Sequence, residues 1–154
     1  IHEGKIKSAL ALCEKYDSPV ARLVEKGIER IGRPLPDIQA AVENMGNVEV
    51  ARLEKGLPML ATIAGGAPMI GFLGTVSGMI QAFFRMSTAG NNIDITLLSG
   101  GIYEAMVTTV GGLFVGIIAY FGYNFLTSQI SNLVFKMEST TIEFIDMLHE
   151  PAGK

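Results

Sequence analysis

Apolar and polar positions alternate at helical spacing over residues 1–55. The first apolar face is formed by Ile6, Ala9, Leu10 and Cys13. Ser18 followed by Pro19 is typical of a helix start and predicts a second helix. Pro36-Asp37 predicts a third helix, which could run on into the segment that follows. The pattern thus predicts amphipathic helices whose apolar faces pack against each other, or against a later helix of the chain, rather than lie on a membrane surface.

Two long segments that are almost free of charge come next. Residues 56–84 hold no Asp, Glu, Lys or Arg, and residues 95–135 hold only Glu104. About 20 apolar residues are enough to cross a hydrocarbon core of about 30 Å as a helix. Both segments therefore predict transmembrane helices. The second is long enough to extend beyond the bilayer, and the polar side chains at 124–132 agree with that exit.

The predicted fold class is all-α, a helical membrane protein whose long transmembrane helices extend into a cytoplasmic helical domain. Nine of the 12 Lys and Arg residues precede the first span, one lies between the spans and two follow the second. Because basic residues concentrate on the cytoplasmic side, both ends are expected there, and Asp94 is expected to cap the second span. The expected segments are a cytoplasmic helical domain at 1–55, a transmembrane helix at 56–84, a periplasmic loop at 85–94, a long transmembrane helix with a cytoplasmic extension at 95–135, and a cytoplasmic C-terminal segment at 136–154.

Charge is as unevenly distributed as hydrophobicity. Charged residues make up 18% of the chain, below the roughly 25% of an ordinary soluble domain. The 80 residues from 56 to 135 hold only three of them, Arg85, Asp94 and Glu104. Because the helices of a soluble domain need a solvated face, this distribution excludes a soluble globule, and its apolar content excludes a disordered chain. A lipid membrane is the first expected partner.

Several other classes of protein are excluded by composition. A net charge of −3 offers no basic surface for nucleic acid. The single cysteine excludes a disulfide framework, and His2 and His149 give no spacing for a metal site. The glycines at 66–78 are not followed by the lysine of a phosphate loop, and no catalytic triad is visible. The sequence therefore predicts no enzyme, no metal and no bound cofactor.

Small residues recur every three or four positions in both predicted spans. Each span contains one GxxxG pattern, which lets helix backbones approach closely in lipid. The proline of the first span lacks an amide hydrogen and is expected to kink its helix. The residues expected to serve in helix packing are Pro68, Gly71, Gly74, Gly78, Gly112 and Gly116.

Glu104 is the acidic residue expected near the middle of the membrane. An ionised side chain at that depth costs roughly 2.5 to 3.5 kcal/mol, so its presence favours a function. Thr108 lies on the same helix face, Thr109 lies beside it, and Thr75 is a matching hydroxyl in the first span. These hydroxyls can bind a dehydrated cation or pass a proton, although a membrane threonine often bonds a carbonyl of its own helix. We expect an ion path through the four residues rather than a purely structural contact.

Two runs resemble a known family. Ala67-Pro-Met-Ile-Gly-Phe-Leu-Gly-Thr-Val-Ser-Gly-Met-Ile-Gln-Ala-Phe83 resembles the second transmembrane signature of the MotA/TolQ/ExbB proton-channel family. Gly101-Ile-Tyr-Glu-Ala-Met-Val-Thr-Thr-Val-Gly-Gly-Leu113 resembles the third, in the form found in ExbB and TolQ. A weaker similarity covers Arg52–Leu60, and Ser77 departs from the tryptophan often found at that position.

The resemblance implies a particular assembly. Family members have three transmembrane helices, so the chain is expected to begin inside the cytoplasmic domain and to lack the first span. They form homopentamers around a pair of helices from a single-span ExbD or TolR partner. Glu104 matches the acidic residue of the third span, Thr109 the threonine five positions later, and Thr75 the threonine of the second-span signature.

The implied function is that of a pore-forming subunit in the bacterial inner membrane. Ion flow would drive the partner, and TonB or TolA would transmit force to the outer membrane. The translocated ion would be H⁺, with Na⁺ as an alternative suggested by the additional hydroxyl of Thr108. An ExbB role is favoured, with a TolQ role as the alternative and a membrane scaffold as the less favoured one. A flagellar stator would need a longer cytoplasmic loop.

Overall fold

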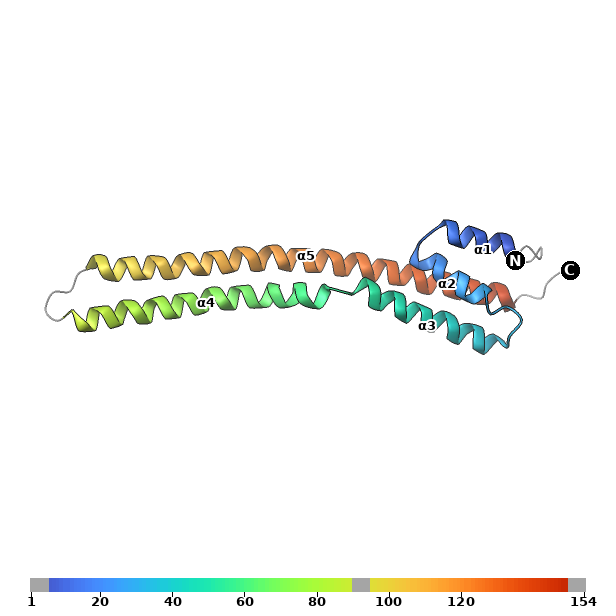
Figure 1. The fold of residues 1–154 in the computed structure, drawn as a ribbon, viewed down its shortest axis with the longest axis horizontal. Helices are drawn as coiled ribbons and strands as arrows, with labels where there is room; N and C mark the ends of the chain where they lie inside the picture. Colours follow the sequence, from blue (N-terminus) through green and yellow to red (C-terminus); the bar gives the residue numbers. More distant parts are fainter. Residues whose placement is uncertain (1–5, 90–94, 150–154) are drawn as a thin grey trace. The chain divides into compact units, whose positions relative to one another are not determined.

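The computed structural model describes residues 6–89 and 95–149 (Figure 1). Within these ranges the chain forms helices and no strand, which confirms the predicted all-α class. Asp94, the predicted cap of the second span, lies outside them. The helices are α1 (Ile6–Lys15), α2 (Pro19–Ile28), α3 (Leu35–Leu53), α4 (Leu57–Thr88) and α5 (Ile95–His149).

The chain divides into two compact units. The first, which we call the helical domain, combines the residues up to 55 with those from 128 onward, and the second, which we call the hairpin, comprises residues 56–127. Helix α5 contributes to both units, and it continues across position 135, where the sequence suggested a separate C-terminal segment. Each unit has its own packing.

The start of α2 has the predicted cap. Ser18 lies in an extended conformation, and its hydroxyl oxygen accepts a hydrogen bond of 3.2 Å from the amide of Ala21. Pro19 occupies the first turn, where a missing amide hydrogen leaves no bond unmade. The predicted Ser18-Pro19 helix start is therefore confirmed.

A turn separates α3 from α4. Helix α3 begins at Leu35, ends at Leu53, and is followed by three turn residues before α4. Gly56, the last of these, has a φ of 98°, a left-handed conformation that side-chain-bearing residues rarely adopt. Pro58 then lies in the first turn of α4. The expectation that the third helix could run into the first span is thus wrong, because the glycine supports a turn there.

The helical domain has an apolar core. Its buried side chains come from α2, α3 and the end of α5, and the apolar face of α1 packs around them. This confirms that the amphipathic helices cover each other and the extension of the second span. The buried residues are Leu23, Ile28, Ile38, Val42, Met137 and Phe144.

Gly27 lets α2 approach α5 within this core. A Cβ atom added at Gly27 would overlap the ring of Phe144, with its Cζ at 2.8 Å, and would lie 3.1 Å from Cγ2 of Val42. Since 2.8 Å is closer than such atoms pack, the ring occupies space that only a glycine leaves open. Gly27 is buried as a result.

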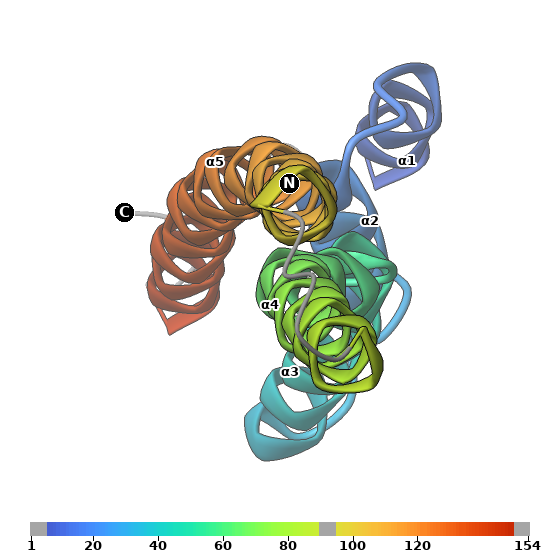
Figure 2. The same cartoon turned by 90° about the vertical axis from the view of Figure 1, so that its left-hand side faces the viewer.

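The hairpin consists of α4 and the first part of α5, which run antiparallel and side by side (Figures 1 and 2). Both helices are long and apolar enough to cross a membrane. Large apolar side chains such as Phe72, Leu73, Phe114 and Phe121 are exposed along them. Because a helix in lipid satisfies its own backbone hydrogen bonds and exposes apolar side chains, this surface suits a bilayer.

Residues 85–88, which the sequence placed in the loop, belong to α4. Arg85 is therefore held by a helix in the last turn before the connection. This placement determines which side chains it can meet on α5.

Candidate functional site

The backbones of α4 and α5 approach each other closely at Gly71 and Gly112. A Cβ atom added to Gly112 would lie 2.5 Å from the carbonyl oxygen of Ala67 and 2.8 Å from Cα of Gly71. One added to Gly71 would lie 3.0 Å from the carbonyl oxygen of Thr108. Neither position has room for a side chain, so the two glycines allow the helices to touch through their backbones.

The same close packing continues toward both ends of the hairpin. A Cβ atom on Gly78 would lie 2.7 Å from Cβ of Ala105, and one on Gly116 would lie 2.6 Å from Cγ of Pro68. The structure thus brings these predicted packing residues against the opposite helix. Helix α4 continues through Pro68, and the kink expected there stays a prediction.

Thr75 of α4 and Thr109 of α5 face each other beside this contact. Their hydroxyl groups hydrogen-bond to each other across the two helices. Thr109 also donates to the carbonyl of Gly71 at 3.1 Å. The Thr75 hydroxyl lies 3.3 Å from both the carbonyl of Gly71 and that of Ala105. We call this arrangement the threonine pair.

The threonine pair has more acceptors than protons. Each hydroxyl carries one proton and can accept further bonds through its oxygen. When Thr109 donates to Gly71, Thr75 can donate to Thr109. When Thr109 instead donates to Thr75, Thr75 can donate to Ala105. The geometry therefore accommodates two hydrogen-bond directions. Reversing them relays a proton only if a proton donor reaches one hydroxyl and an acceptor such as water reaches the other.

A polar groove opens between α4 and α5 on the loop side of the pair. Its volume is about 140 Å³. Small residues of both helices line it: Gly74, Gly78, Ala82, Gly101 and Ala105. Its polar lining consists of Ser77, Gln81, Arg85, Glu104 and Thr108.

Glu104 lines this groove but does not join the threonine pair. Its side chain is exposed on the single chain, and within the described residues it makes no hydrogen bond or ion pair. Arg85 lines the same groove and likewise has no ion pair among the described residues. The structure thus places the predicted acid in the open groove rather than in the threonine pair.

Thr108 is bonded within its own helix, although the sequence predicts it as part of an ion path. Its hydroxyl donates to the carbonyl of Ala105, on its own helix, at 2.7 Å. Its side chain occupies the space left by Gly74, where an added Cβ would lie 2.8 Å from Cβ of Thr108. The alternative raised by the sequence, a threonine bonded within its own helix, describes Thr108 better than it describes Thr109.

Sequence reasoning missed one side of the groove. Ser77, Gln81 and Arg85 follow each other at intervals of four residues and so share one face of α4. The Gln81 amide lies 3.5 Å from the hydroxyl of Ser77. The signal is visible in the sequence as polar residues spaced by four at the end of an otherwise apolar span.

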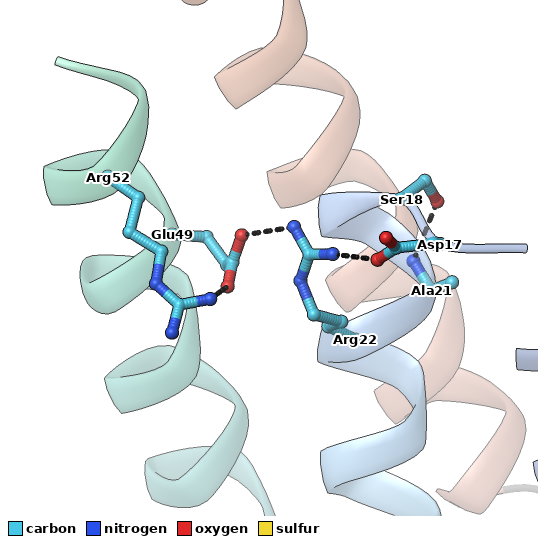
Figure 3. A network of polar contacts seen from close by, with 6 residues as sticks. All are labelled: Asp17, Ser18, Ala21, Arg22, Glu49 and Arg52. Atoms are coloured by element: carbon cyan, nitrogen blue, oxygen red, sulfur yellow. Dashed lines mark hydrogen bonds and ion pairs between the residues drawn. The ribbon is translucent and has the colours of Figure 1, made fainter. Parts of the chain in front are cut away.

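A second polar cluster lies in the helical domain (Figure 3). Glu49 of α3 is only 1% exposed, and its carboxylate accepts bonds from Arg22 of α2 at 2.7 Å and from Arg52 at 3.0 Å. Arg22 also pairs with Asp17. The hydrogen bond from Arg22 lowers the pKa of Glu49, and the same bond raises the pKa of Arg22. This cluster joins α2 to α3 and was not predicted, since Arg22 and Glu49 are 27 positions apart.

Within the described ranges, no group of three or more His, Cys, Asp or Glu side chains could hold a metal ion. The candidate site is built from hydroxyls, backbone carbonyls, the carboxylate of Glu104, the amide of Gln81 and the guanidinium of Arg85. The oxygen-bearing groups among these can carry protons or bind a monovalent cation, and neither process changes a covalent bond in a substrate.

The model of the MotA/TolQ/ExbB proton channel family matches residues 15–139. This match covers most of the chain, including both predicted spans and the groove between them.

Individual relatives agree with the family match. The chain is 32% identical to a biopolymer transport ExbB homolog of Methanothermobacter thermautotrophicus over 138 residues, which are 90% of this chain and 48% of the relative. It is 36% identical to the Tol-Pal system protein TolQ of Haemophilus influenzae, over 69% of this chain and 46% of the relative. It is 35% identical to the biopolymer transport protein ExbB of Xanthomonas campestris, over 59% and 36%. The chain thus spans about half or less of the length of these relatives.

Proposed function

Because the chain belongs to the MotA/TolQ/ExbB proton channel family, we propose that it is a pore-forming subunit of an ExbB–ExbD-type motor in the bacterial inner membrane. The motor uses the proton motive force to drive TonB-dependent transport across the outer membrane. The family is one of transport proteins, and the groups of the candidate site suit ion transfer rather than catalysis.

The observation that carries this proposal is the threonine pair beside the groove that holds Glu104. Two hydroxyls from opposite helices share a hydrogen bond with two possible directions, and the carboxylate lies in open space on the loop side. A proton can bind Glu104 from the groove, and the proposed path needs water between the carboxylate and the hydroxyls to carry it on. One charge crossing 100 mV releases about 2.3 kcal/mol, similar to the cost of an ionised acid in the membrane.

The exposure of Glu104 supports an assembly with other chains. An ionisable side chain at membrane depth normally faces the interior of a bundle or a water-filled cavity. On the single chain the groove is open. We propose that it is covered in a homopentamer by the helices of a single-span ExbD- or TolR-type partner, and that the partner passes motion to a TonB- or TolA-type protein.

A TolQ-type role in the Tol-Pal system is the second candidate. The chain is as similar to the TolQ of Haemophilus influenzae as it is to the ExbB of Xanthomonas campestris. The partner that co-purifies with the chain from its own cells separates the two roles. A Na⁺-driven motor is a further alternative, because the hydroxyls of Thr75 and Thr109 and two nearby carbonyls are oxygen ligands.

Energised uptake in cells tests the proposed ExbB role. We expect Glu104→Ala and Thr109→Ala, each present at wild-type abundance, to abolish TonB-dependent uptake, whereas a purely structural scaffold would retain it. Thr62→Ala is a matched control, because Thr62 is exposed on α4 and its hydroxyl only bonds the carbonyl of Pro58. Normal uptake in both test variants would contradict the proposal.

A further inference from the structure

Arg85 and Glu104 are the two charged side chains of the described hairpin residues, 57–89 and 95–127. They have opposite charge, come from different helices, and line the same groove. The other polar residues of the groove are neutral, and the Thr108 hydroxyl already donates to a carbonyl of its own helix. Arg85 is thus the one cation of the described residues that shares the groove with the Glu104 carboxylate.

The register of the hairpin places the two side chains within reach of each other. Gly101 packs against Ala82, where an added Cβ would lie 2.8 Å from Cβ of Ala82. Arg85 lies three residues from Ala82 toward the loop, and Glu104 lies three residues from Gly101 in the opposite direction. At 1.5 Å per residue, the two positions are about 9 Å apart along the helices. A long arginine side chain can span much of this distance through the groove, which has room for several water molecules.

A pair of opposite charges relieves the cost that either charge would carry alone. The ionised carboxylate of Glu104 is expensive at membrane depth, and its attraction to a cation held nearby is stronger there than in water. The guanidinium cannot lose its proton, so it stays charged whatever the state of Glu104. It lines the groove and makes no ion pair among the described residues, so within these residues it is available to the carboxylate.

We propose that Arg85 is the tethered counter-ion of Glu104 and makes the groove selective for H⁺ over Na⁺. The inference rests on the proposed ion-transfer function. A proton forms an O–H bond with the carboxylate and releases the guanidinium. Na⁺ can only bind electrostatically, and it has to displace a cation that is held beside the carboxylate at high effective concentration. Arg85 is a specificity-determining residue in this scheme, and it does not itself carry the proton.

Ion flux through the reconstituted full-length subunit with its single-span partner tests this selectivity. Wild-type H⁺ flux is expected to be the same in NaCl as in choline chloride. In Arg85→Gln, Na⁺ is expected to inhibit H⁺ flux or to be carried, with sensitivity to Na⁺ raised about tenfold or more. Arg85→Lys keeps a cation and is expected to behave like the wild type. An Arg85→Gln variant whose flux is as indifferent to Na⁺ as the wild type would overturn the inference.

A melting experiment on the same complex does not depend on ion flow. Arg85→Gln, Glu104→Gln and the double variant are compared with the wild type. If Arg85 and Glu104 interact, the double variant is expected to melt no lower than the less stable of the two single variants. If the wild type conducts and the melting shifts simply add, the pairing of Arg85 with Glu104 is refuted. If the shifts are coupled but the wild type carries no ions, the pairing stands and the proposed function is refuted.

Discussion

Thr75 and Thr109 show how few atoms the proposed ion path requires. Both hydroxyls belong to residues that also pack between the helices, and each lies close to a carbonyl of the opposite helix. A bond between hydroxyls in the membrane contributes roughly 0.6 to 2 kcal/mol to association, so its loss is measurable without being fatal to folding. The role of these residues in transport can therefore be separated from their role in packing.

Replacing Thr109 with valine removes the hydroxyl and keeps the branched shape. We expect Thr109→Val to lose ion transfer and to destabilise the complex by only about 1 kcal/mol. Thr109→Ser restores the hydroxyl and is expected to regain transport. Uptake and melting temperature of the purified complex are the two measurements. If Thr109→Val transported as well as Thr109→Ser and the wild type, the hydroxyl would not be needed.

Glu49 makes the helical domain sensitive to acid. The pKa of Glu49 is lowered from 4.5, first by the hydrogen bond from Arg22, so the folded state favours the ionised form. Its contribution to stability is present above the ordinary pKa and is lost as the pH falls through the lowered value. We expect hydrogen-exchange protection of α2 and α3 in the full chain to decrease as the pH is lowered below 4.5.

Glu49→Gln tests the origin of this pH dependence. Loss of the charge weakens the bond to Arg22, which keeps its pair with Asp17, and is expected to cost about 1 to 3 kcal/mol at neutral pH. The acid-dependent loss of protection should then be smaller than in the wild type. Glu54→Gln, an exposed change in the turn after α3, serves as the control. A Glu49→Gln variant with wild-type protection and wild-type acid response would contradict the role of the cluster.

The sequence predicted the residues of the candidate site unevenly. Glu104 was visible as a single acid in a long apolar segment, and Thr75 and Thr109 as hydroxyls in recognisable signatures. The sequence predicts a loop at Arg85, because it does not show that α4 continues to Thr88. The pairing of Arg22 with Glu49 depends on how α2 and α3 pack, which spacing along the chain does not reveal.

At the level of the helices, glycines determine how closely α4 approaches α5. Gly112 and Gly111 are neighbours with opposite environments. A Cβ on Gly112 would meet backbone atoms of α4, whereas one on Gly111 would meet nothing within 4 Å. This pair therefore separates the effect of close packing from the general effect of replacing a glycine in a helix.

We expect Gly112→Ala to force α4 and α5 apart and to destabilise the complex by about 1 to 3 kcal/mol. Gly111→Ala should be neutral or slightly stabilising, since alanine favours a helix. Thermal melting of the detergent-solubilised complex compares the two. If both substitutions had the same effect, backbone contact at Gly112 would not be what holds the hairpin together.

Gly27 offers the equivalent test in the helical domain. Gly27→Ala would place a methyl group against the ring of Phe144, whereas Gly46→Ala on α3 would make an ordinary contact of 3.7 Å with Leu23. Gly27→Ala is expected to cost about 1 to 3 kcal/mol through overpacking. Limited proteolysis of the full chain should cleave this variant faster than Gly46→Ala. Equal cleavage rates would argue against close packing of α2 on α5.

The helices were more predictable than their connections. Caps and periodicity indicated α2, and the absence of charge indicated α4 and α5. The turn at Gly56 was missed because a glycine beside an apolar segment is compatible with both a helix and a break. Contacts of the GxxxG glycines with particular partners, such as Gly116 with Pro68, require the register of the two helices.

At the scale of the whole molecule, the chain combines a helical domain with a membrane hairpin. The helical domain has an apolar core, while the hairpin exposes apolar side chains and an open polar groove. In the proposed motor, lipid would cover the apolar side chains and further subunits would cover the groove. We propose that ions pass through this groove and the threonine pair.

Proton flux into vesicles that contain the full-length subunit and its single-span partner tests this claim most directly. With an imposed membrane potential, the wild-type complex is expected to acidify the vesicle interior. Glu104→Gln and Thr109→Val are expected to reduce the flux at least tenfold, and Glu143→Gln, an exposed change on α5 outside the hairpin, to leave it unchanged. Wild-type flux in both test variants would contradict the account.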